Sequence, residues 1–164
     1  MTDLSPTLAS IDALASEGIT ILSGLENLLN QELAVLKARE IDAIRNINTE
    51  KQTLLRQFDQ NNQARAELLI AAGLPVSKDG LSSLLSQSQN KALTRQFNTH
   101  WGDLETILKK TMDANQRNEQ IVMRSSQNLD KLLSVLRGQK PSNSLYTAKG
   151  AKGNYTGQSH IGKA

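Results

Sequence analysis

Apolar residues recur at alternating steps of three and four positions through the first part of the chain, and this spacing restricts the fold more than any other feature of the sequence. A seven-residue repeat of this kind is typical of helices that pack lengthwise against other helices. A second set of apolar residues repeats every seven positions beside the first and widens the apolar face beyond that of a two-stranded coiled coil. We therefore expect this helix to bury against two neighbours. The first set comprises Leu8, Ile11, Ala15, Gly18, Leu22, Leu25, Leu29, Glu32 and Leu36, and the second comprises Leu14, Ile21, Leu28 and Val35.

Three prolines, Pro6, Pro75 and Pro141, lie where helices would begin or end rather than inside the periodic segments. Between them the pattern predicts an all-α, coiled-coil-like bundle: an antiparallel hairpin of two long helices, a short helix at residues 81–85 and a third long helix at residues 89–137. The segment around residue 40 has neither glycine nor proline, so one unbroken helix is the alternative to a turn. A turn is favoured because one straight amphipathic helix running through both of the first two helical segments would need a partner helix of equal length.

Residues 138–164 differ in composition from residues 1–137. They contain five of the ten glycines, four basic residues and no acidic residue. Such a segment buries too little apolar surface to offset the entropy of ordering, so we expect a helical bundle domain at 1–137 and a flexible basic tail at 138–164. Residues 1–137 then carry 15 basic residues against 16 acidic residues, and this balance argues against binding to nucleic acid.

Composition also excludes several classes of chemistry. The chain has no cysteine, and its two histidines lie 60 positions apart, so we expect no metal site and no cofactor. Its carboxylate pairs do not share a helical face beside a predicted cleft, and we expect no enzymatic activity. The longest nearly apolar run, at residues 68–76, is too short for a membrane span. The amino terminus lacks the basic segment of a secretory signal, and a cytoplasmic location follows as the expectation.

The third long helix is predicted to be longer than the hairpin beside which it packs. If each arm has about 35 residues, the helix passes the tip of the hairpin near residue 124, and about 13 residues, or roughly 20 Å, remain beyond it. An uncovered apolar face of this kind is typical of a site for a partner helix. The alternatives are that the first two helices bend to cover it or that it forms a homodimer. The apolar residues beyond the tip are Leu129, Leu132, Leu133, Val135 and Leu136.

Asn115 and Asn118 fall on the otherwise apolar face of the third long helix. Buried asparagines at such positions fix the register of helices in coiled coils, and we favour this structural role for both residues. A contact with a partner protein is the alternative.

The sequence resembles the FlgN-type flagellar export chaperones over nearly its whole length. The resemblance is carried by five segments, which occur in the family's order and at similar spacing. They are LSGLENLLNQELAVLKARE, EKQTLL, HWGDLETILKKTMDANQRNEQIV, LLSVLRG and SLYTAKG.

The resemblance implies a chaperone that binds the C-terminal helical region of hook-filament junction proteins, prevents their premature assembly and delivers them to the flagellar type III export gate. It assigns client binding to an apolar stripe, which we define as Val122, Leu129, Leu132, Leu133 and Leu136. The alternative is a structural coiled-coil protein that homo-oligomerises through the same apolar stripe.

The resemblance also assigns a role to the tail. The family's tail tyrosine, which docks the chaperone to the cytoplasmic domain of the export gate, matches Tyr146. This sequence continues beyond a shorter family pattern with KGNYTGQSHIGKA, so Tyr155 is a second candidate for the docking role.

Overall fold

A computed structural model of the chain describes residues 2–136, 144–146 and 152–154. The chain divides into two compact units, residues 1–118 and 119–164. The described residues are mostly helical, and the predicted all-α class is confirmed. The elements in chain order are α1 (Ser5–Ala38), α2 (Ile41–Ala71), α3 (Lys78–Ser86), α4 (Lys91–Leu136), β1 (Ser144–Tyr146) and β2 (Lys152–Asn154).

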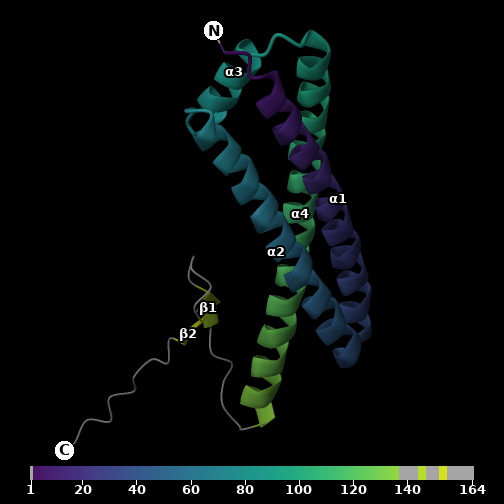
Figure 1. The fold of residues 1–164 in the computed structure, drawn as a ribbon. Coiled ribbons are helices and arrows are strands. Elements are labelled where there is room, and N and C mark those ends of the chain that lie inside the picture. The colour runs from purple at the N-terminus through teal and green to yellow at the C-terminus, as the bar shows by residue number, and fades with distance from the viewer. Residues whose placement is uncertain (1, 137–143, 147–151, 155–164) are drawn as a thin grey trace, which may run out of the picture. The chain divides into compact units, whose positions relative to one another are not determined.

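A tight turn separates α1 from α2, as the sequence predicts (Figure 1). Arg39 adopts the left-handed conformation, with φ of 58°, directly after the last residue of α1. The backbone N–H of Glu40 donates to the carbonyl of Val35 at 3.1 Å, and that of Arg39 donates to Leu36 at 3.3 Å. These bonds satisfy carbonyls that the end of a helix would otherwise leave unpaired. The turn therefore forms without the glycine that usually occupies this position.

Within residues 1–118, α4 lies beside α1 and runs in the same direction (Figure 1). Oγ1 of Thr111 donates to the carbonyl of Leu22 at 3.4 Å, and Nδ2 of Asn118 donates to the carbonyl of Leu29 at 2.7 Å. The two donors and the two acceptors are each seven residues apart, so the helices keep one register along this length. Since α2 also contacts α1, the expectation of two neighbours for α1 is confirmed.

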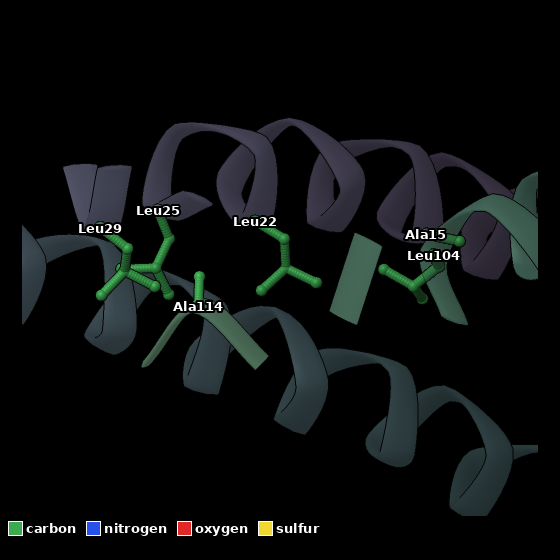
Figure 2. Packing of buried hydrophobic residues seen from close by; sticks show 6 residues of the cluster. All are labelled: Ala15, Leu22, Leu25, Leu29, Leu104 and Ala114. Carbon is green, nitrogen blue, oxygen red and sulfur yellow. The ribbon is translucent and has the colours of Figure 1, made fainter. Parts of the chain in front are cut away.

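Two apolar clusters form the core of the bundle. The first lies along the middle of α1, and Figure 2 shows Ala15 close to Leu104 and the side chains of Leu25 and Leu29 close to Ala114. The second lies at the end of the bundle that carries α3, and Phe97 is its largest buried side chain. Half-buried Trp101 packs against both clusters and joins them into a continuous core. The buried members of the second cluster are Leu8, Ile11, Leu69, Leu84 and Phe97.

The short helix is longer than its sequence predicts. α3 begins at Lys78 rather than near residue 81, because the side chain of Ser77 accepts a hydrogen bond from the backbone N–H of Gly80 at 3.4 Å and caps the first turn. A Cβ atom at Gly80 would lie 1.8 Å from the carbonyl oxygen of Pro75. The absence of a side chain at Gly80 therefore allows the first turn of α3 to pack directly against the preceding loop.

Among the described residues one helix, α1, is long and apolar enough to cross a membrane. Core helices of soluble proteins meet the same criterion, and 44% of the most apolar stretch of α1 is buried inside the structure. Asp12 and Glu32, both on α1, are buried and make polar contacts with neighbouring helices. These contacts favour a core helix over a membrane span.

The tail contains one feature that the sequence analysis does not predict. β1 and β2 pair as an antiparallel two-stranded sheet, with Leu145 opposite Gly153 and Tyr146 opposite Lys152. The other residues of the predicted flexible tail lie outside the described residues, so flexibility stays a prediction.

Candidate functional site

The candidate site lies at the C-terminal end of α4. Of the residues that α4 buries, Asn118 is the last, and none of residues 119–136 is buried. The buried face of α4 therefore ends earlier than residue 124, the position that the helix lengths predict. The 18 residues after Asn118 correspond to about 27 Å of helix at 1.5 Å per residue.

All five residues of the apolar stripe are exposed. Their exposed fractions run from 47% for Leu133 to 82% for Leu136. Met123 and Val135 add further exposed apolar surface in the same segment, and the sequence analysis does not single out Met123. Isolated exposed leucines are common on protein surfaces, but a group of large apolar side chains in 15 residues of one helix is unusual and typical of an interaction site.

The apolar stripe continues the helical face that α4 buries closer to its start. Leu104, Thr111 and Asn118 lie seven residues apart and are buried. Leu132 occupies the same position of the seven-residue repeat, two repeats after Asn118. Since side chains seven residues apart share a helical face, one face of α4 is covered in its first part and exposed in its last part.

Asn118 belongs to a polar cluster that links three helices. Its Nδ2 atom donates to Oε1 of Glu32 at 2.9 Å as well as to the carbonyl of Leu29. Nζ of Lys51, on α2, lies 2.8 Å from Oε2 of the same carboxylate. Arg117 donates to Oδ1 of Asn118 at 3.1 Å. We call Glu32, Lys51, Arg117 and Asn118 the Asn118 cluster; Asn115, the other asparagine of the predicted pair, is half-buried.

A second buried carboxylate, Asp12, lies closer to the start of α1. Its oxygens contact Nε2 of Gln96 at 2.7 Å and Nδ1 of His100 at 2.8 Å, both on α4. The sequence does not predict this cluster, because nothing in the local pattern indicates that a residue 88 positions away faces Asp12. Within the described residues no three histidine, cysteine or acidic side chains are grouped as they would be at a metal site.

Arg65 is a buried basic residue of α2. Its guanidinium lies 5.4 Å from the ring centre of Trp101 and 5.9 Å from that of Phe58, which are cation–π distances. Nη2 donates to Oδ1 of Asn62 at 3.3 Å, while Nε has no hydrogen-bond partner. Burial lowers the pKa of Arg65 from its ordinary value. Arg65 therefore places a basic group in the interior of the bundle beside two aromatic rings.

The two tyrosines of the predicted gate-docking site are described to different extents. Tyr146 is the last residue of β1, where its backbone pairs with Lys152 of β2. Tyr155 lies outside the described residues. Their docking role stays a prediction.

The architecture defines a class of small helical protein, in which a hairpin of two long helices packs with a third long helix that ends in an exposed apolar segment. Within this class the family is shown by the sequence. The model of the family described as FlgN protein matches residues 4–154, and the chain belongs to the FlgN family. This is a family of flagellar chaperones and is not known for enzymatic activity.

A solved structure supports this assignment. The chain is similar to a crystal structure from Pseudomonas aeruginosa that is provisionally described as a flagella synthesis protein FlgN. The two sequences are 29% identical, the TM-score is 0.61, and the match covers 77% of this chain and 93% of the other. A comparison with curated proteins finds no match.

Proposed function

We propose that the protein is a cytoplasmic chaperone that binds the C-terminal helical region of hook-filament junction proteins, prevents their premature assembly and delivers them to the flagellar type III export gate. Membership of the FlgN family supports the general role. The observation that supports the site is the exposed apolar stripe on the last part of α4. An amphipathic client helix would cover this surface and bury its own apolar face at the same time.

The tail supplies a separate site in this proposal. Tyr146 and Tyr155 dock the loaded chaperone to the cytoplasmic domain of the export gate. Aromatic side chains are common anchors at protein interfaces, and these are the two tyrosines of the chain. Both lie beyond Pro141, which ends any continuation of the helix that carries the apolar stripe. Client binding and gate docking therefore use different parts of the chain.

The test replaces Leu132 and Leu136 with aspartate and measures binding to a C-terminal fragment of a junction protein by calorimetry. Two charges within the apolar stripe should abolish binding, whereas helicity should change little because both side chains are exposed. The matched control places aspartate at Gln120 and Asn128, which are exposed polar residues of the same helical segment outside the apolar stripe.

Three outcomes contradict the proposal. In the first, the wild-type protein binds no junction-protein fragment. In the second, the Leu132→Asp, Leu136→Asp variant keeps full affinity. Alternatively, the wild-type protein forms oligomers with rising concentration, does not bind the fragment, and loses these oligomers in the variant. The last result supports the structural coiled-coil alternative, and sedimentation velocity detects it.

A further inference from the structure

The Asn118 cluster lies where the buried face of α4 ends. Asn118 is 2% exposed, and no later residue of α4 is buried. Both oxygens of Glu32 are occupied, since Oε1 accepts from Asn118 and Oε2 contacts Lys51. These contacts therefore link α1, α2 and α4 at Asn118, directly before residues 119–136.

The cluster has a counterpart near the start of the buried face. There Asp12 of α1 contacts Gln96 and His100 of α4, again with both carboxylate oxygens occupied. A buried carboxylate that loses its partners is costly, so each cluster resists local separation of α4 from α1. The two clusters are similar in chemistry and differ in position along α4. Asn118 directly precedes residues 119–136 in the chain, whereas the partners of Asp12 lie near the start of the helix.

None of the residues that follow Asn118 in α4 is buried. An isolated helix of about 18 residues is marginal in water, and segments with few buried contacts open at low free energy. Much of the cost of forming a helix is its first turn. A turn that is already held in place removes this cost for the residues that follow it.

We propose that Asn118, Glu32 and Lys51 are positioning residues for client binding. They hold the last packed turn of α4, stop local unfolding of residues 119–136 from spreading into the bundle, and provide the formed turn from which this segment becomes helical against a client. The client part of this inference rests on the proposed function. The anchoring part concerns the free protein and stands without it.

The test compares two variants that each disturb one carboxylate cluster. Asn118→Asp keeps the size of the side chain, removes the two donated hydrogen bonds and places a second carboxylate beside Glu32. His100→Ala removes a contact to Asp12 at the other end of the buried face. In hydrogen exchange of the full chain without client, Asn118→Asp should speed exchange of amides 112–118 by about tenfold or more, whereas His100→Ala should leave these amides within about twofold of wild type.

A rescue variant separates positioning from general destabilisation. In the double variant Asn118→Asp, Glu32→Gln, the amide at position 32 can donate to the new carboxylate, so exchange of residues 112–118 should slow again. Affinity for a C-terminal junction-protein fragment, measured by calorimetry, should fall about tenfold in Asn118→Asp, recover in the double variant and change less than about threefold in His100→Ala.

Two results overturn the inference. In the first, amides 112–118 exchange as in wild type when Asn118 is replaced. In the second, Asn118→Asp and His100→Ala lower fragment affinity equally and in proportion to their global stability. If the wild-type protein binds no fragment, the proposed function is wrong, and the exchange experiment alone decides whether Asn118 anchors α4.

Discussion

Nδ1 of His100 lies 2.8 Å from Oδ1 of Asp12, although the two residues are 88 positions apart in the sequence. The other carboxylate oxygen of Asp12 accepts a hydrogen bond from Gln96, and the aspartate is only 4% exposed. One buried side chain of α1 thus satisfies two polar side chains of α4. Acidic residues are usually exposed and contribute little to stability. We expect Asp12 to contribute more to the free energy of unfolding, because it is buried and hydrogen-bonded.

Replacement of Asp12 by alanine should destabilise the bundle by about 2–4 kcal/mol, because the partners lose their acceptor and the buried site gains a void. The control is Asp103→Ala, which removes an exposed carboxylate from α4 and should change stability by less than about 0.5 kcal/mol. Urea unfolding followed by the fluorescence of Trp101 measures both. Equal stability of the two variants would show that the contacts of Asp12 contribute nothing net.

The helical bundle could be predicted because its helices are indicated by patterns within short stretches of the sequence. The repeat from Leu8 to Leu36 indicates a long helix with a wide apolar face, and the turn near residue 40 follows from the need for a partner of equal length. An exposed end of α4 is predicted by comparing helix lengths. The position where burial ends, at Asn118 rather than near residue 124, depends on packing that helix lengths do not contain.

The polar core could not be predicted in the same way. Glu32 and Asn118 occupy positions that the repeat marks as facing other helices, but their contact with each other and with Lys51 depends on the relative register of three helices. On the second helix the structure buries Asn61, whose Nδ2 donates to the carbonyl of Leu14, and leaves its neighbour Asn62 exposed. Adjacent residues of a helix point in different directions, so an error of one position predicts the wrong buried side chain. A polar helix has few apolar residues from which its buried face can be determined.

Asp3 should make stability depend on pH in the acid range. Hydrogen bonds from the hydroxyl of Ser5, then from the backbone N–H groups of Gln89 and Ser5, lower the pKa of Asp3 below the ordinary value of an aspartate. A carboxylate with a lowered pKa stabilises the folded state above its unfolded pKa, and this contribution is lost as pH falls through the lower folded value.

Asp3→Asn should therefore be less stable than wild type at pH 6, and the difference should shrink steadily below about pH 4. Unfolding in urea at pH 6, 4 and 3 measures this difference, with Asp103→Asn as the control for an exposed carboxylate on α4. A difference that stays constant over this range would mean that the ionised form of Asp3 is not what the hydrogen bonds stabilise.

Two glycines should respond in opposite directions to alanine. A Cβ atom at Gly80 would overlap the carbonyl oxygen of Pro75, whereas one at Gly102 meets nothing within 4 Å. Gly80→Ala should cost about 1–3 kcal/mol, since the start of α3 must move away from the loop. Gly102→Ala should stabilise α4 by about 0.5–1 kcal/mol, because glycine is unfavourable inside a helix. Thermal unfolding of both variants tests the close approach of α3, and equal melting temperatures would refute it.

Gate docking and client binding should depend on different residues. Tyr146→Ala should leave affinity for the junction-protein fragment unchanged, because Tyr146 lies beyond Gly138 and Pro141 and cannot extend the apolar stripe as a helix. The same change should weaken binding to the cytoplasmic domain of the export gate and reduce secretion of junction proteins, since an aromatic anchor contributes out of proportion to its number of contacts. If Tyr155 can take over this role, the double variant with Tyr155→Ala should show the larger loss.

The matched control for the tyrosines is the double variant Thr147→Ala, Thr156→Ala, which changes the residue after each tyrosine and retains both aromatic rings. It should bind the gate as the wild type does. Calorimetric titration against the gate's cytoplasmic domain and against the client fragment distinguishes the two sites in one set of proteins. Gate affinity that survives the loss of both tyrosines would place docking elsewhere on the chain. Loss of client affinity in the same variant would mean that the tail and the apolar stripe act as one surface.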